Sequence, residues 1–133
     1  SCMKVMKFSG EILDSIFILT ERYQYCLLGY DEQAKKFIDK GNGSLVNRIG
    51  RPHDHGKLCT IDPEGKMVAC YLYEGTVHII PVDARGHLMP DYIVQIDVFR
   101  IKNMTFLYGY EKPVLVVLHS DSNNIEHLRT YVI

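Results

Sequence analysis

Short runs of β-branched and aromatic residues, separated by turn signals, follow one another along almost the whole chain. Helical periodicity is nearly absent, so the pattern predicts an all-β fold. Turns such as Asp62-Pro63-Glu64-Gly65 and Asp121-Ser122-Asn123-Asn124 separate the runs. The predicted strands lie near Lys4–Phe8, Ser15–Thr20, Gln24–Tyr30, Lys35–Ile38, Lys57–Ile61, Lys66–Tyr73, Thr76–Val82, Tyr92–Val98, Ile101–Leu107, Pro113–His119 and Ile125–Val132.

The strands form groups that repeat along the chain. The second strand of each group begins at Ser15, Lys66 and Pro113, which are 51 and 47 residues apart. A period of roughly 50 residues with four short strands per unit is typical of β-propeller blades. The segment Met67–Tyr73 is apolar without a break, as in a strand that is covered on both faces. An ordinary sandwich or barrel has similar strand spacing, and periodicity alone does not separate these folds.

The repeat divides the chain into four parts of one propeller. We expect a first blade in residues 1–40, a crossover loop in residues 41–56, a second blade in residues 57–98 and an incomplete third blade in residues 101–133. A propeller closes with about four to eight blades. The pattern therefore predicts about two blades plus three strands of a third, with the fold completed by residues outside this chain.

Composition narrows the function classes. The chain has 133 residues, of which 47% are hydrophobic and 23% charged, and its net charge is -1. A near-neutral chain lacks the excess of Lys and Arg on which bulk nucleic-acid binding and basic membrane-surface segments depend. No apolar run approaches the ~20 residues that span a bilayer. The four cysteines form no C-x-x-C pair, which favours reduced, packed thiols in a nuclear or cytosolic protein.

No catalytic or metal-binding motif stands out. His53 and His55 flank Asp54, but no further His or Cys pair lies nearby at ligand spacing. There is no Gly-x-Ser-x-Gly elbow, and the Gly41–Gly43 segment is too short for a phosphate-binding loop. We therefore expect neither an enzyme nor a cofactor or metal site.

The long connection carries the densest cationic patch, which is formed by Arg48, Arg51 and Lys57 together with two histidines. The residue before proline is pushed out of the helical region, so Arg51-Pro52 holds its guanidinium in an extended segment. Arginine is enriched at protein interfaces. From residue types alone, an interface and a solvated loop remain equally open.

Several short motifs occur in one order and at one spacing, and together they indicate a family. They are Arg48-Ile49-Gly50-Arg51-Pro52, Ile61-Asp62-Pro63-Glu64, Leu72-Tyr73-Glu74-Gly75, Ile80-Pro81-Val82-Asp83 and Phe106-Leu107-Tyr108-Gly109. Nearly the whole chain resembles the first propeller of the damage-specific DNA-binding protein 1 family, the large subunits of the UV-damaged-DNA-binding complex.

The resemblance implies a seven-bladed propeller within a three-propeller adaptor of cullin-4 RING E3 ubiquitin ligases, with a role in DNA-damage repair. Another propeller of such an adaptor grips the cullin, and damaged DNA is reached only through a partner subunit. The resemblance also implies a nuclear and cytoplasmic protein, with no membrane contact. It assigns substrate-receptor binding to one loop, formed by Arg48, Ile49, Gly50, Arg51, Pro52, His53 and Asp54.

The chain departs from the family pattern at several positions. His53 and His55 replace small hydroxyl residues, Tyr71 stands where an arginine is usual, and Gln95 replaces a basic residue. These differences predict a less basic receptor cleft. The alternative is an RNA-processing scaffold of the polyadenylation-factor or splicing-factor large-subunit type, which shares this architecture.

Overall fold

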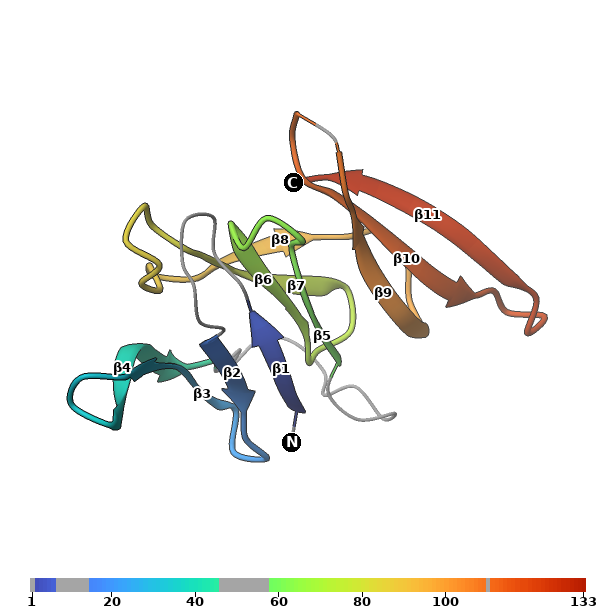
Figure 1. Ribbon diagram of the computed structural model, residues 1–133. Coiled ribbons are helices and arrows are strands. Elements are labelled where there is room, and N and C mark those ends of the chain that lie inside the picture. Colours follow the sequence, from blue (N-terminus) through green and yellow to red (C-terminus); the bar gives the residue numbers. More distant parts are fainter. Residues whose placement is uncertain (1, 7–14, 46–57, 110) are drawn as a thin grey trace.

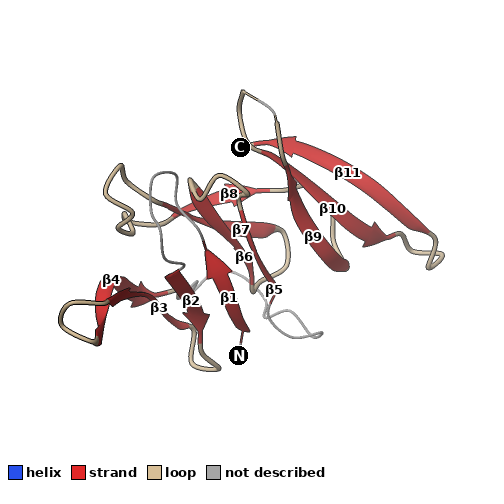
Figure 2. Cartoon of the chain, in the orientation of Figure 1, coloured by secondary structure: helices blue, strands red, loops and turns tan. Residues whose placement is uncertain are grey.

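The computed structural model describes residues 2–6, 15–45, 58–109 and 111–133, which form three antiparallel sheets (Figures 1 and 2). Blade 1 consists of β1 (Cys2–Met6), β2 (Ser15–Leu19), β3 (Gln24–Asp31) and β4 (Lys36–Ser44). Blade 2 consists of β5 (Leu58–Ile61), β6 (Met67–Tyr71), β7 (Thr76–Pro81) and β8 (Tyr92–Gln95). Blade 3 consists of β9 (Ile101–Leu107), β10 (Val114–Ser120) and β11 (Glu126–Val132).

The three sheets are arranged as neighbouring propeller blades. Strand β5 contacts both β1 and β9, so the first strands of the blades lie next to one another. Within each sheet the remaining strands follow in chain order toward the periphery. Two four-stranded sheets and one three-stranded sheet, radiating from adjacent first strands, confirm the predicted partial propeller. No helix in the described part of the chain is long and apolar enough to cross a membrane.

Blade 2 is covered on both faces, because β6 divides its side chains between two apolar cores. Val68 and Cys70 face blade 1, whereas Ala69 and Tyr71 face blade 3. All four residues are fully buried. This alternation is the period of a strand, and it explains the unbroken apolar run in the sequence.

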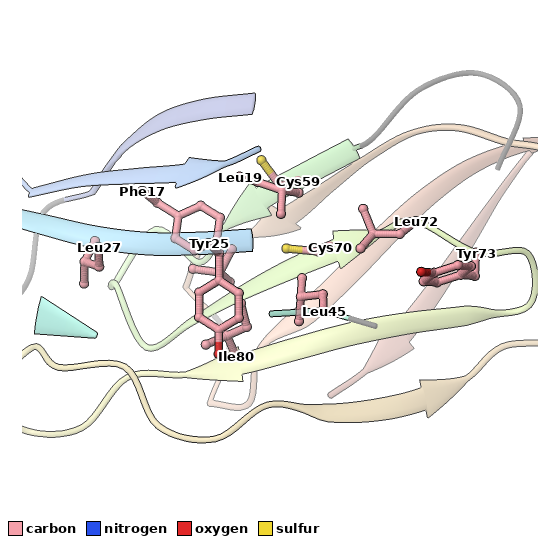
Figure 3. Packing of buried hydrophobic residues seen from close by; sticks show 11 residues of the cluster. Phe17, Leu19, Tyr25, Leu27, Leu45, Cys59, Cys70, Leu72, Tyr73 and Ile80 are labelled. Carbon is pink, nitrogen blue, oxygen red and sulfur yellow. The ribbon is translucent and has the colours of Figure 1, made fainter. Parts of the chain in front are cut away.

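The blade 1–2 core is the cluster shown in Figure 3. It joins Phe17, Leu19, Tyr25, Leu27 and Leu45 of blade 1 to Cys59, Val68, Cys70, Leu72, Tyr73 and Ile80 of blade 2.

The blade 2–3 core is a second cluster of similar size. It joins Ala69, Tyr71, Val77, Ile79, Ile96 and Val98 to Ile101, Met104, Phe106, Leu115 and Val117.

The other face of blade 1 and the other face of blade 3 have no covering sheet among the described residues. Exposed apolar side chains lie on both. On blade 1, Met3 is 68% and Phe37 58% exposed, and on blade 3, Leu128 is 71% and Val132 68% exposed. Apolar side chains exposed on an uncovered sheet face suit packing against another surface.

Several predicted strand ends are wrong, and Lys66–Tyr73, for example, is observed as Met67–Tyr71. Strand β4 continues to Ser44 instead of ending near Ile38, so 41–44 belong to the strand and not to the crossover loop. Its regularity is broken by a shift opposite Cys26 and Leu28, and Gly43 is required where the strand passes Tyr25. A Cβ on Gly43 would lie 2.6 Å from the Tyr25 hydroxyl. A sequence pattern does not reveal such a close approach.

Strand β8 is shorter than predicted, because it ends at Gln95. Ile96 and Val98 keep the alternation but turn into the blade 2–3 core. The Ile96 N–H donates to Gly75 O at 3.0 Å, which fastens this segment to a turn instead of to a neighbouring strand.

The prediction of four reduced thiols is also wrong. Cys26 and Cys70 are free, but Cys59 is disulfide-bonded. Cys59 lies on β5, which packs beside a strand that is far away in the sequence. Sequence spacing is therefore a poor guide to cysteine pairing in this fold.

Candidate protein-binding loop face

The turns at one end of the blades form a continuous surface, which we call the loop face. Because the strands are antiparallel, every second connection emerges at the same end. In the described residues the loop face consists of 20–23, 72–75, 96–100 and 121–125, together with Leu45. The predicted receptor loop begins at Arg48, three residues after Leu45 in the sequence.

The predicted site residues Arg48, Ile49, Gly50, Arg51, Pro52, His53 and Asp54 lie outside the described residues, as do His55 and Lys57. The loop face is therefore characterised by the residues around the start of this loop.

Leu45 anchors the start of the loop in the blade 1–2 core. Its side chain is buried, and its N–H donates to Tyr23 O at 2.7 Å. Tyr23 has a φ of 61°, which is uncommon for a non-glycine residue. The turn around it is held by Thr20, whose hydroxyl accepts the N–H of Gln24 at 3.2 Å. The stem of the predicted loop is thus tied to the β2–β3 turn.

Aromatic rings continue from this stem into the interface between blades 1 and 2. Tyr23 packs on Tyr73 with ring centroids 5.6 Å apart, and Tyr73 packs on His78 at 6.1 Å. His78 is buried, and its Nδ1 lies 3.3 Å from Asp91 Oδ2. His78 Nε2 has no hydrogen-bond partner among the described residues. Because Tyr23 holds Leu45 and also packs on Tyr73, the geometry of the loop face depends on the packing between blades 1 and 2.

Tyr71, a predicted departure from the family pattern, contributes no charge to the loop face. Its side chain is buried and its hydroxyl donates to Glu74 Oε2 at 2.6 Å. Burial raises the pKa of Tyr71 well above its usual value, and the bond to Glu74 raises it further. Gln95, the second predicted departure, is exposed at the end of β8. The two positions therefore carry a buried neutral hydroxyl and an exposed neutral amide.

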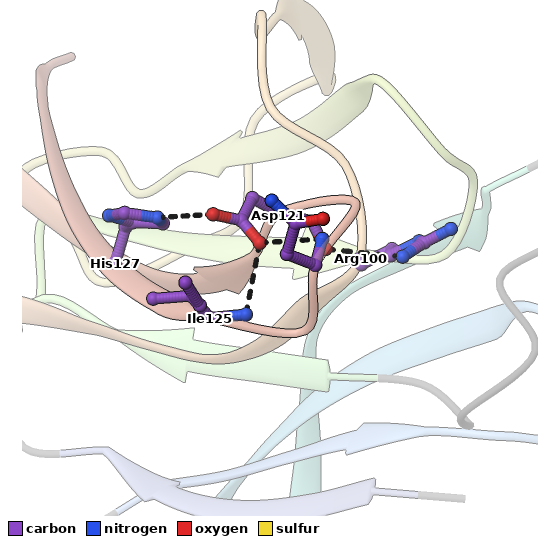
Figure 4. A network of polar contacts seen from close by, with 5 residues as sticks. Arg100, Asp121, Ile125 and His127 are labelled. Carbon is purple, nitrogen blue, oxygen red and sulfur yellow. Dashed lines mark hydrogen bonds and ion pairs between the residues drawn. The ribbon is translucent and has the colours of Figure 1, made fainter.

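Glu74 also connects blade 2 to blade 3 through Arg100. The Arg100 N–H donates to Glu74 Oε2 at 3.3 Å, and Arg100 Nη1 donates to Asp121 O at 3.2 Å. Asp121 in turn organises the β10–β11 turn, as Figure 4 shows. Its Oδ1 accepts the Ile125 N–H at 2.9 Å, and its Oδ2 lies 2.9 Å from His127 Nε2. The bond to His127 first, and then the Ile125 N–H, hold the pKa of Asp121 below its usual value.

Asp97 makes the corresponding contact between the β8–β9 connection and β11. Its Oδ1 accepts the Tyr131 hydroxyl at 2.7 Å and its Oδ2 pairs with Arg129 Nη2 at 2.7 Å. The bond from Tyr131 is the largest cause of a lowered Asp97 pKa. Burial, with the bond to Asp97, raises the pKa of Tyr131 to about 12.

Sequence reasoning missed the roles of Asp97, Arg100 and Asp121. The sequence pattern indicates Asp121 only as part of a turn, and it predicts no role for Arg100. The signal available was the crowding of charged residues beside turns, which many solvated loops share. Among the described residues, no group of three His, Cys, Asp or Glu side chains is placed to hold a metal ion. The arrangement consists of fixed, satisfied polar groups on rigid turns, which suits contact with another macromolecule.

The fold and this face define a segment of a β-propeller that presents loops at one end. The family model "RSE1/DDB1/CPSF1 first beta-propeller" matches residues 1–133, and the chain belongs to this family. It is 36% identical over 129 residues to "DNA damage-binding protein 1" of Solanum lycopersicum and 34% identical to "DNA damage-binding protein 1b" of Arabidopsis thaliana. It is 33% identical to "DNA damage-binding protein 1" of Oryza sativa subsp. japonica. Each match covers 97% of this chain and 12% of the relative.

Proposed function

We propose that this propeller segment belongs to a scaffold that holds substrate receptors of a cullin-4 RING E3 ubiquitin ligase, with a role in DNA-damage repair. The observation that carries the proposal is the 33–36% identity, over 97% of the chain, to proteins named DNA damage-binding protein 1. In this role the chain performs no chemistry of its own and needs no cofactor. It acts in the nucleus and cytoplasm, and damaged DNA is reached through a partner subunit.

The open faces of blades 1 and 3 fit this role. Their exposed apolar side chains suit packing against further blades of a longer chain, and a seven-bladed ring is the form expected from the resemblance. These relatives are much longer than this chain, since the matches cover 12% of each of them. The cullin would contact another propeller of that longer protein.

The loop Arg48–Asp54 is proposed as the receptor contact. It follows Leu45, whose anchoring to Tyr23 supports a loop that keeps its direction. Arg51 would pair with a receptor carboxylate or with the C-terminal carbonyls of a receptor helix. Because a loop charge affects recognition more than folding, Arg51→Glu should weaken receptor binding without unfolding the propeller.

The test is affinity purification of the intact protein, followed by a binding titration. Recovery of a cullin, a RING subunit and receptors supports the proposal, whereas recovery of polyadenylation or splicing subunits favours the RNA-processing alternative. With a recovered receptor, Arg51→Glu should raise the dissociation constant by about tenfold or more, the change produced by reversing one charge in a close pair. The matched control is Arg85→Glu in the β7–β8 connection, at the opposite end of the blades. Equal affinities for both variants would contradict the assigned contact.

A further inference from the structure

The connection between β8 and β9 places an exposed aromatic ring beside an arginine in the left-handed conformation. Phe99 is 57% exposed, and its ring lies over the turn at Gly75, where an added Cβ would be 3.4 Å from the ring. Arg100 has a φ of 55°. Residues held in this sparsely populated region are concentrated at ligand-binding and other functional sites.

The backbone and the side chain of Arg100 are both fixed. Its N–H donates to Glu74 Oε2, its O accepts the Ser120 N–H at 3.3 Å, and its Nη1 donates to Asp121 O. These contacts come from turns of two different blades, and Figure 4 shows the guanidinium directed toward the β10–β11 turn. The direction of the positive charge is therefore determined before any partner arrives, which lowers the entropy cost of binding.

The charge balance around Arg100 leaves its guanidinium available. The neighbouring carboxylates are occupied, Asp97 by Tyr131 and Arg129, and Asp121 by His127 and turn N–H groups. Among the described residues Arg100 forms no ion pair, and its side chain bonds only a neutral carbonyl. A guanidinium has five N–H donors, and this side chain is exposed.

A surface pocket is lined by Asp97, Val98, Phe99 and Arg100 of the β8–β9 connection and by His119, Ser120, Asp121 and Ser122 of blade 3. Its two carboxylates are the ones already bonded to other groups, which leaves Arg100 as the charged group of the pocket without an ion-pair partner among the described residues. We propose that this pocket binds a partner segment in which a carboxylate side chain lies next to an apolar side chain. The carboxylate pairs with the fork of Arg100, and the apolar side chain packs on Phe99. Aromatic and arginine anchors are the residues that dominate interface energetics. For the identity of the partner as a substrate receptor, this inference rests on the function proposed above.

The test uses a photo-crosslinking residue in the intact protein. Ser122 is exposed at the pocket, and no contact described above involves its side chain, so Ser122→benzoylphenylalanine places the probe without disturbing either anchor. After illumination in cell extract, mass spectrometry identifies the crosslinked partner segments. We expect an Asp or Glu adjacent to an apolar residue in these segments, at a frequency above that in the uncrosslinked peptides of the same proteins.

The matched variants separate charge from backbone effects. Asn tolerates the left-handed conformation, so Arg100→Asn removes the guanidinium and keeps the turn. It should lower the crosslinking yield by about tenfold or more, as expected for loss of one charge-assisted pair. The control is Lys35→Asn in the β3–β4 turn at the opposite end of the blades, where Lys35 has a φ of 53°, and it should leave the yield unchanged. Equal yields in the two variants, the absence of crosslinks, or segments without carboxylates would overturn the inference.

The two proposals fail separately. If receptors and a cullin are recovered but their crosslinks do not depend on Arg100, the pocket assignment is wrong and the scaffold proposal stands. If acidic segments crosslink in an Arg100-dependent manner and no ligase subunit is recovered, the pocket assignment stands and the scaffold proposal is wrong.

Discussion

The two interfaces between blades have apolar cores of similar size but differ in where their charged groups lie. Between blades 1 and 2, His78 is 1% exposed and lies within the interface, and Asp91 is its partner. Burial raises the pKa of Tyr25 and Cys70, and the charge of Asp91 raises both further. Polar atoms are therefore part of this interface.

Between blades 2 and 3, the buried Tyr71 bonds to Glu74 through its hydroxyl, and the other polar contacts described above lie at the margin of the core. Asp97 and Asp121 make their bonds among exposed side chains. A polar group at the margin can exchange its partner for water, whereas a buried one cannot. The same blade geometry therefore occurs with two arrangements of polar groups. The blade 1–2 interface contains the buried His78 with its partner Asp91, whereas Asp97 and Asp121 make their contacts at the margin of the blade 2–3 interface.

The largest expected loss of stability comes from removing a buried side chain from either apolar core, a feature that both interfaces share. Leu27→Ala and Leu115→Ala each remove a fully buried side chain, one from each core. We expect each to lower the free energy of unfolding by about 2–5 kcal/mol, through lost burial and a residual cavity. Urea denaturation of the intact protein measures both. A cost below about 1 kcal/mol for either variant would show that its core is not closed as described.

A smaller effect distinguishes the two interfaces. Asp91→Ala leaves buried His78 with neither ring nitrogen paired among the described residues, which should cost about 1–3 kcal/mol. Asp97→Ala is the matched variant, and because its contacts are at exposed side chains we expect a smaller loss of stability than for Asp91→Ala. Both are measured as changes in the free energy of unfolding. If the two variants cost the same, the contrast between buried and marginal polar groups is wrong.

The smallest effect is a pH dependence of the marginal contacts. The folded-state pKa values of Asp97 and Asp121 are lowered, by Tyr131 and by His127 respectively. The charged carboxylates therefore stabilise the fold above their unfolded-state pKa of about 4, and this contribution is lost as the pH falls through the lowered folded-state values. The stability difference between the wild type and the double variant Asp97→Asn/Asp121→Asn should shrink as the pH falls from about 6 to about 2. Urea denaturation at several pH values measures it, and a constant difference would contradict the assignment.

Much of the fold was predictable because strand patterns are local. The turn at Asp62–Gly65 was predicted from its residues, and the Gly65 N–H donates to Asp62 O at 2.8 Å. The strand Ile101–Leu107 was predicted at its observed bounds. The end of β4 was missed because it depends on a close approach to Tyr25. Of the candidate site, the predicted loop remains a prediction, and the supporting roles of Tyr23, Glu74 and Arg100 were not foreseen.

The sequence by itself determined the all-β class, the repeat of about 50 residues and the two-sided burial of β6, because each follows from the order of apolar residues along a strand. Only the tertiary structure decided which turns share the loop face and which polar groups meet there. Asp97 reaches Tyr131, and Glu74 reaches Arg100, across separations of 34 and 26 residues. Such contacts arise because packed blades bring distant turns together, and no local pattern encodes which turns become neighbours.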